Sequence, residues 1–340
     1  MAKSYEYYLE IEFDNNNDTV IYEGNSYISS NHTADMVSLK YSGIRISFTR
    51  TYKKKWEDFR DQKNGPVMNH LKKALCCYML AKGSIPECRA AVFAAEGREQ
   101  ELYDLKNKLN DQSGGKLDIK LRRSDFSRVF TGDTEERKAL YNSMTFFIHS
   151  QLSGNSPHDS MRAAWSSLNA LYTEIHGTGK EQEKLDELWE YIPQLNMNKT
   201  TEYIIGLDDS VWNSLDWEKY VENGISNQER KNNFKRLLDG LFAEQADFDS
   251  LLGGLLFAAA KEKFPDLVNN CTASNVKKRI AFMVCRYCYF KRNMSMHAGM
   301  PYPLYVFSEK EESRTENILV KILNYTVRDI LTERYFCNNP

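Results

Sequence analysis

The sequence lacks the features that mark membrane-spanning and secreted proteins. Its longest apolar stretch, around residues 251–260, is about half the length that a membrane-spanning helix needs. The polar start Met1–Ser4 does not have the charged-then-apolar pattern of a secretory signal. The seven cysteines are an odd number, and the adjacent Cys76 and Cys77 cannot easily bridge each other. We therefore expect a soluble protein of a reducing compartment, located in the cytoplasm.

Signals for nucleotide binding, repeats and strong overall charge are missing as well. Gly253-Gly254 lies in an apolar run without the Lys-Ser/Thr pair of a phosphate-binding loop. No repeat at a solenoid period is visible. The formal net charge of −2 excludes a globally basic nucleic-acid binder, although a local basic site remains open. With 340 residues, of which 41% are hydrophobic and 27% charged, the chain is long enough for two folded domains.

Residues 1–130 have the pattern of a small α/β domain. Hydrophobic and polar residues alternate over Tyr5–Phe13, which predicts a half-buried strand. Pro66 predicts the start of a helix that ends at Gly83. The spacing predicts further strands at residues 20–22, 26–28, 36–48 and 88–95, and a polar amphipathic helix at 98–109.

Residues 131–340 are almost wholly helical in pattern, so the expected fold class is α+β. Ser156-Pro157 predicts the start of a helix that Gly177 ends. The segment from Pro193 to about Asn227 is irregular and polar, as in an insertion. Other helices are expected to begin at Thr134, to cover residues 185–192, 234–243, 248–264 and 274–298, and to close the chain over 311–336. Together they predict a helical bundle.

The late part of this region has no acidic residue between Asp266 and Glu309. Such a local concentration of positive charge attracts phosphate groups. A solvated helix face, or a complement to an acidic neighbour, would explain the same pattern. The candidate RNA-binding residues are Lys277, Lys278, Arg279, Arg286, Tyr289 and Lys291.

Helical geometry groups three side chains that suit RNA cleavage without a metal. At about 100° per residue, Phe282, Arg286, Tyr289, Asn293 and His297 project into one sector of an α-helix. Arg292 lies to the side, and its long side chain reaches toward His297. A histidine serves as general acid or base. An arginine holds a phosphate bidentately, and an asparagine orients either group through hydrogen bonds.

The segment Tyr289–Gly299 resembles the signature of HEPN domains, in which an Arg and a polar residue precede three variable positions and a His. Helices before the motif and one closing helix after it are similar to that family too, and the likeness covers about residues 138–336. In this chain Ala298 separates His297 from Gly299, where related proteins often have His-Gly directly. The resemblance implies catalytic roles for Arg292, Asn293 and His297.

Many HEPN proteins are ribonucleases of toxin–antitoxin, abortive-infection or CRISPR-associated defence, and their active site usually combines two motifs. Because the motif occurs once here, the resemblance implies a homodimer. We expect an endoribonuclease with no metal and no cofactor, with RNA as its substrate and an antitoxin or defence protein as a further partner. Residues 1–130 would sense a signal or bind substrate or a partner. The alternative is a non-catalytic HEPN-like module that binds RNA, a nucleotide or a protein of a defence complex.

Other groups of chemistry-bearing residues have simpler interpretations. Cys285 and Cys288 form a C-x-x-C pair in the middle of a predicted helix, whereas a redox pair lies at a helix N-terminus. A zinc site would need two further ligands. The cluster Lys53-Lys54-Lys55-Trp56 favours a solvated helix start over an RNA grip. His149, His158 and His176 match no metal-ligand spacing.

Overall fold

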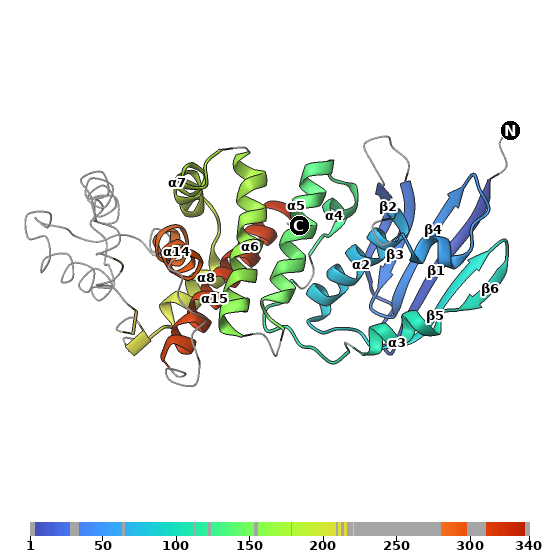
Figure 1. Cartoon of the computed structure of the whole chain (residues 1–340), viewed down its shortest axis with the longest axis horizontal. Coiled ribbons are helices and arrows are strands. Elements are labelled where there is room, and N and C mark those ends of the chain that lie inside the picture. Colours follow the sequence, from blue (N-terminus) through green and yellow to red (C-terminus); the bar gives the residue numbers. More distant parts are fainter. Residues whose placement is uncertain are drawn as a thin grey trace, which may run out of the picture. The chain divides into compact units, whose positions relative to one another are not determined.

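A computed structural model gives the fold of the chain (Figure 1). It describes residues 4–27, 34–62, 65–111, 113–121, 124–152, 156–177, 179–208, 210–211, 214–215, 220, 280–297 and 311–336. The helices predicted at 234–243 and 248–264 lie outside these residues. Of the helix predicted at 274–298, residues 280–297 are described, and they are helical.

The N-terminal part is built on a six-stranded antiparallel sheet. The strand order is β2-β3-β4-β1-β5-β6, so the first strand lies in the middle and the sheet is assembled around it. Each neighbouring pair is antiparallel. The strands are β1 Tyr5–Phe13, β2 Val20–Tyr27, β3 Ala34–Lys40, β4 Gly43–Arg50, β5 Cys88–Ala95 and β6 Arg98–Glu101.

Alternation along β1 puts its apolar side chains on one face of the sheet. Tyr7, Leu9, Ile11 and Phe13 are buried, and the residues between them are more exposed. The helix α2, Pro66–Lys82, packs across β2, β3 and β4 (Figure 1). Aromatic rings fill the space between the layers, since Tyr7 stacks on Phe48 and Phe93 and Phe13 contacts Tyr78. The predicted β1 strand is confirmed.

Two predicted boundaries in the sheet need correction. The region 36–48 is split into β3 and β4 by a turn at Tyr41-Ser42. The segments 20–22 and 26–28 were predicted as separate strands, whereas residues 20–27 form the single strand β2.

The helix predicted at residues 98–109 is wrong in its first part. Arg98–Glu101 pairs with β5 as the edge strand β6, and the helix α3 begins only at Tyr103 and ends at Asn110. All four residues of β6 are exposed, so no alternation marks them as a strand. A short, charged edge strand also discourages pairing with other chains.

The helix α2 begins and ends where the sequence predicts. Pro66 occupies its first turn, and Gly83 follows its last residue with a φ of +83°. This left-handed conformation is one that glycine adopts without steric cost.

Apart from loops, turns and one isolated bridge between Ser84 and Lys116, the rest of the described chain is helical, so the fold class is α+β. The predicted starts at Thr134 and Pro157 are confirmed. The remaining helices are α1 Trp56–Arg60, α4 Ser127–Thr131, α5 Thr134–His149, α6 Pro157–His176, α7 Glu181–Tyr191, α8 Asn198–Ile205, α14 Tyr289–His297 and α15 Glu311–Ile330, with π-helical turns at Met283–Cys288 and Leu331–Tyr335 and a 3-10 turn at Ile192–Gln194.

The helix α8 lies inside the segment predicted to be irregular. Its N-terminus is stabilised from a distance, because the Asp329 carboxylate accepts hydrogen bonds from the backbone N and the Oγ1 of Thr200, each at 2.8 Å. A residue 129 positions away in the sequence thus supplies the cap that local sequence usually provides.

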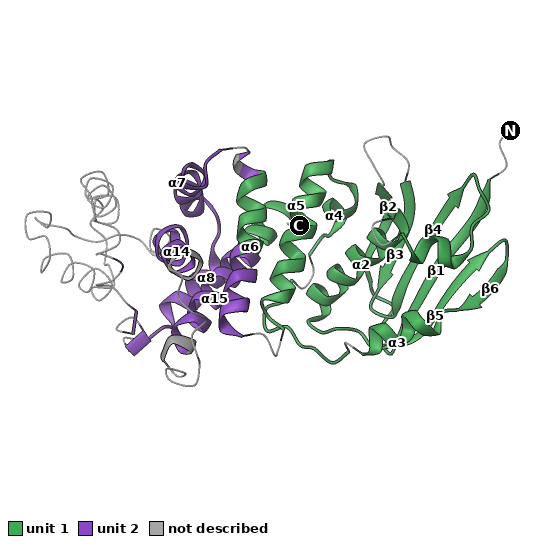
Figure 2. Ribbon diagram, in the orientation of Figure 1, with its two compact units in different colours: residues 1–155, 166–174, 330–340 green, residues 156–165, 175–329 purple. Residues whose placement is uncertain are grey.

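The chain divides into two compact units (Figure 2). Unit 1 comprises residues 1–155, 166–174 and 330–340, and unit 2 comprises 156–165 and 175–329. The sheet with α5 belongs to unit 1, so these units divide the chain differently from the predicted boundary between residues 130 and 131. Among the described helices, none is long and apolar enough to cross a membrane.

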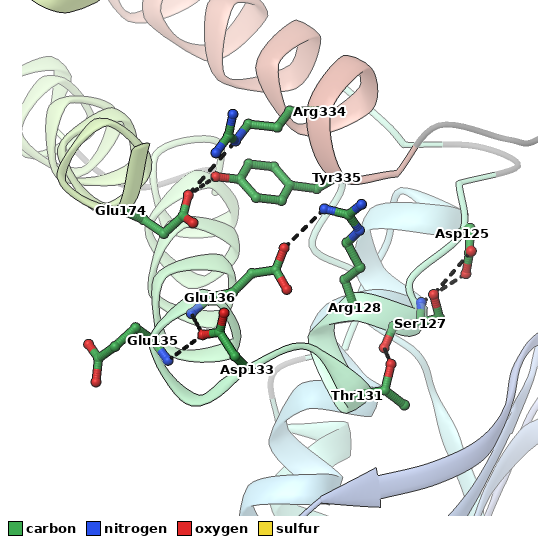
Figure 3. A network of polar contacts seen from close by, with 10 residues as sticks. All are labelled: Asp125, Ser127, Arg128, Thr131, Asp133, Glu135, Glu136, Glu174, Arg334 and Tyr335. Carbon is green, nitrogen blue, oxygen red and sulfur yellow. Dashed lines mark hydrogen bonds and ion pairs between the residues drawn. The ribbon is translucent and has the colours of Figure 1, made fainter. Parts of the chain in front are cut away.

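Polar contacts within unit 1 hold the last described residues against α6 (Figure 3). The Tyr335 hydroxyl donates a hydrogen bond to the Glu174 carboxylate, and Arg334 lies 3.9 Å from the same carboxylate. Burial and the neighbouring Glu174 raise the pKa of Tyr335, which therefore stays protonated as the donor.

Asp133 caps the helix α5 in the same network (Figure 3). Its carboxylate accepts hydrogen bonds from the backbone nitrogens of Glu135 and Glu136 at 3.0 and 2.9 Å. Replacing Asp133 by alanine is expected to lower the free energy of unfolding by about 1 kcal/mol, measured by urea denaturation. Asp133→Asn, which keeps the acceptor oxygen, should lose far less. An equal loss in both variants would argue against capping as the cause.

Candidate functional site

The helix α14, Tyr289–His297, carries the predicted catalytic residues and continues an almost completely buried segment of unit 2. Every residue of 280–288 except Arg286 is buried. A helix that is apolar on all sides requires burial on all sides, and this anchors the start of α14. At that start the ring centroids of Tyr289 and Trp165 lie 5.8 Å apart.

The π-helical turn Met283–Cys288 corrects part of the predicted alignment. The expected common face of Phe282, Arg286, Tyr289, Asn293 and His297 assumed an unbroken α-helix. Because a π-helix has more residues per turn, Phe282 and Arg286 are rotated out of the phase of the residues that follow. Their environments agree with this, since Phe282 is fully buried and the Arg286 side chain is 23% exposed.

Within α14 the helix is regular, and the predicted spacing holds. Asn293 and His297 are four residues apart in one α-helix, which is about one helical turn. His297 ends the helix, and its side chain lies outside the described part of the chain.

Arg292 is held by two acceptors through a single nitrogen. Its Nη1 donates to the Asn293 Oδ1 at 2.8 Å and to the Glu181 Oε2 at 3.3 Å. The Arg292 and Glu181 side chains are 24% and 32% exposed, so this ion pair is only partly shielded from water. The structure therefore joins the Arg and the Asn of the motif directly and adds a carboxylate that the sequence did not predict.

Arg286 makes a second ion pair with the same helix, α7. Its Nη2 donates to the Asp186 Oδ1, and its guanidinium lies over the Trp189 ring, 5.4 Å from the centroid. The Arg286 Nη1 is buried and finds no hydrogen-bond acceptor among the described residues. The earlier arginine, Arg286, pairs with the later carboxylate, Asp186, and Arg292 pairs with Glu181. The segment that carries the arginines and the helix α7 therefore run antiparallel.

The acid-free stretch is thus matched by an acidic helix, at least at these two arginines. The sequence left open that the basic residues pair with an acidic neighbour. Arg286 and Arg292 do so through their ion pairs with α7. Glu181 is the residue beside the motif that sequence reasoning missed, whereas Asp186 and Trp189 are neighbours of Arg286. The signal for the two carboxylates was the acidic composition of residues 181–190.

The other predicted RNA-binding residues are less defined. Tyr289 and Lys291 are half-buried on α14. Lys277, Lys278 and Arg279 lie outside the described residues.

The C-x-x-C pair is buried in the π-helical turn. Cys285 and Cys288 are free thiols and fully buried. Burial raises the pKa of Cys285 to about 12 and also raises that of Cys288. Within the described part of the chain, no group of three or more His, Cys, Asp or Glu side chains is placed to hold a metal ion.

Thiols in this state should not react. We expect iodoacetamide at pH 8 to leave Cys285 and Cys288 of the native protein unmodified, because the thiolate is the reactive form and neither thiol reaches solvent. Mass spectrometry of peptides checks this, with guanidinium-unfolded protein as the fully labelled control. Rapid labelling of the native protein at either position would contradict a purely structural role.

The cluster at residues 53–56 follows its simpler interpretation. Lys55 precedes the helix α1 and Trp56 is buried at its start. Lys53 pairs with Glu96 at 2.9 Å, and the Lys54 ammonium lies 5.4 Å from the centroid of the Phe59 ring.

A second group of reactive residue types meets between the sheet and α2. The Ser26 Oγ lies 2.6 Å from the His70 Nδ1, and the His70 Nε2 lies 3.2 Å from the Asp35 carboxylate. Arg50 donates two hydrogen bonds of 2.8 Å to the same carboxylate. Ser26, Asp35 and His70 are each at most 2% exposed. A nucleophile has to reach its substrate, so we interpret this group as a structural network.

Comparison of the chain with protein-family models, with curated proteins and with solved structures gave no match. The role of the Arg292–Asn293 pair therefore rests on the geometry of this chain.

Proposed function

We propose that the chain is a metal-independent endoribonuclease of the HEPN type, with residues 131–340 as the HEPN-like bundle. The observation that carries this is the hydrogen bond from Arg292 to Asn293, one helical turn before His297 on the same α-helix. It joins a phosphate-binding cation to an orienting amide beside a residue able to move protons near neutral pH.

The reaction is cleavage of RNA by its own 2′-OH. The 2′-oxygen attacks the adjacent phosphorus while the bond from phosphorus to the 5′-oxygen breaks, which leaves a 2′,3′-cyclic phosphate and a 5′-hydroxyl. His297 accepts the proton of the 2′-OH or donates one to the leaving oxygen. Arg292 stabilises the charge on the phosphate in the transition state, and Asn293 orients the arginine.

A single motif in the chain implies that the active site is completed by a second copy, as in a homodimer. Lys277, Lys278, Arg279, Arg286, Tyr289 and Lys291 would bind the flanking RNA. The N-terminal region would sense a signal or bind substrate or a partner, by fold-level analogy alone. In this proposal the enzyme acts in the cytoplasm, in antiviral defence or toxin-type growth arrest.

The test is cleavage of structured RNA by the purified protein in EDTA. We expect products with 2′,3′-cyclic phosphate and 5′-hydroxyl ends. The same RNA with 2′-O-methyl groups should remain intact, because its 2′-oxygen has no proton to lose. Cleavage that needs added metal, or that leaves 5′-phosphate ends, would reject the proposed mechanism.

A second candidate is a non-catalytic HEPN-like module that binds RNA, a nucleotide or a protein of a defence complex. The ion pairs of Arg286 and Arg292 with α7 favour it, because they partly neutralise the two guanidiniums that a phosphate would contact. Salt-dependent RNA binding without cleavage of any RNA is the result that would select this candidate.

A further inference from the structure

We infer that Glu181, on α7 and outside the motif, is a positioning residue that sets the orientation of the Arg292 guanidinium. The inference rests on the proposed ribonuclease function and adds a residue to that site. It concerns the direction in which Arg292 presents its hydrogen-bond donors, and it is carried by the two contacts of the Arg292 Nη1.

The geometry accounts for both hydrogens of one nitrogen. A guanidinium is planar, and Nη1 carries two of its five N–H donors. Glu181 accepts at 3.3 Å and Asn293 accepts at 2.8 Å, both from Nη1. Two acceptors on one nitrogen fix the plane of the guanidinium and with it the directions of its other N–H donors. Bidentate arginine contacts depend on this kind of alignment.

The helix α7 gives Glu181 a defined place. Glu181 is its first residue, and the turn is stabilised because the Lys180 backbone nitrogen donates to the Glu183 carboxylate at 3.1 Å. Leu185 and Leu188 are fully buried, which anchors the helix by its apolar side. A carboxylate on such a helix restrains its partner better than one on a loop would.

The charge of Glu181 acts in the opposite direction on binding. A carboxylate near the arginine repels the phosphate that Arg292 is to hold. A positioning role for Glu181 therefore predicts opposite effects on catalysis and on RNA binding. Removal of Glu181 weakens catalysis while RNA binds more tightly, whereas removal of a competing anion would improve both.

The chain offers a matched control in Asp186. It also forms an ion pair from α7, but with Arg286 in the π-helical turn, which lies outside the motif. Damage to the packing of α7 would follow from either loss, and an effect on the orientation of Arg292 would follow only from the loss of Glu181.

The experiment measures kcat and KM for cleavage of one RNA substrate in EDTA. It compares the unmodified protein with the full-length Glu181→Ala, Glu181→Gln and Asp186→Ala proteins. We expect Glu181→Ala to lower kcat about 10-fold. We expect its KM to be unchanged or to fall about 2- to 5-fold. Glu181→Gln keeps an acceptor oxygen and should remain within about 3-fold of the original kcat. Asp186→Ala should keep its kcat. An equal or raised kcat for Glu181→Ala, or an equal loss for Asp186→Ala, overturns the inference.

A readout without activity separates this inference from the proposed function. In protein with ¹³C,¹⁵N-labelled arginine, a held guanidinium gives distinct Nη1 and Nη2 signals, which Arg292→Lys identifies by their loss. We expect Glu181→Ala to average them through rotation, and Glu181→Gln to keep them distinct. Averaged signals in the unmodified protein reject the role of Glu181. Failure of the unmodified protein to cleave RNA, with distinct signals, rejects the ribonuclease function instead.

Discussion

Replacing His297 by alanine is expected to lower the rate of RNA cleavage by at least about 100-fold, since general acid–base catalysis contributes about 10²- to 10⁴-fold. The residue lies one helical turn beyond the Arg292–Asn293 pair on α14. Loss of the imidazole removes the group that moves the proton and leaves the phosphate contacts in place. Cleavage of structured RNA in EDTA measures the rate, and circular dichroism shows that the fold persists.

His158 supplies the matched control for this substitution. It is a half-buried histidine in the first turn of α6, outside the motif, and His158→Ala should cleave RNA at the original rate. Undiminished cleavage by His297→Ala would reject the assignment of the site. A strictly monomeric protein by light scattering would reject a site made from two copies.

The largest effect on stability is expected from Arg50→Met, in the buried network of unit 1. Arg50 is the bidentate partner of Asp35, whose side chain is 1% exposed. Without Arg50 the buried Asp35 charge keeps only the His70 ring as a partner, so the free energy of unfolding at pH 7 should fall by about 3 kcal/mol. Urea denaturation followed by circular dichroism measures the loss.

Arg45→Met is the control on the same strand. Arg45 pairs with Glu10 at 3.4 Å, and their side chains are 49% and 37% exposed. An exposed pair contributes little, so this variant should lose less than about 1 kcal/mol. Similar losses in both variants would show that the burial of Asp35 is not what makes Arg50 important.

Lowering the pH should reduce the difference between the original protein and Arg50→Met. Burial alone would raise the pKa of Asp35, but Arg50 and His70 beside it lower the pKa below the ordinary value of 3.8. The stability from the charged carboxylate is therefore present above pH 3.8 and is lost as the pH falls through the lower folded value. In Arg50→Met only His70 still opposes the effect of burial on the Asp35 pKa, so this carboxyl should take up a proton at a higher pH and acid should narrow the gap between the proteins.

Local pattern predicted the elements whose stabilisation is local. Strand β1 follows from its alternation, and α2 follows from Pro66 and Gly83, because burial of one face and helix capping are written in neighbouring residues. The edge strand β6 and the helix α8 were not predicted. The first depends on pairing with β5, and the second has its N-terminus capped by Asp329, far away in the sequence.

The candidate site shows the same limit. Its motif lies within one helix of nine residues, so neighbouring residues and the family resemblance were enough to predict Arg292, Asn293 and His297 as a site. The acidic partners of Arg292 and Arg286 come from α7 and lie 111 and 100 positions earlier in the chain. Charge composition left an acidic complement open as one alternative and did not identify which helix would supply it.

The π-helical turn Met283–Cys288 takes up one residue more than an α-helix would in the same turn. Removing one residue there would therefore let an ordinary α-helix continue into α14 with the motif facing nearly the same way. The apolar character of residues 280–288 would hardly change, so such a deletion would leave little trace in a hydropathy profile. Loss of one codon in this part of the gene would thus preserve both the buried helix and the contact of Arg292 with Glu181, whereas the same loss within α14 before Arg292 would turn the motif by about 100°.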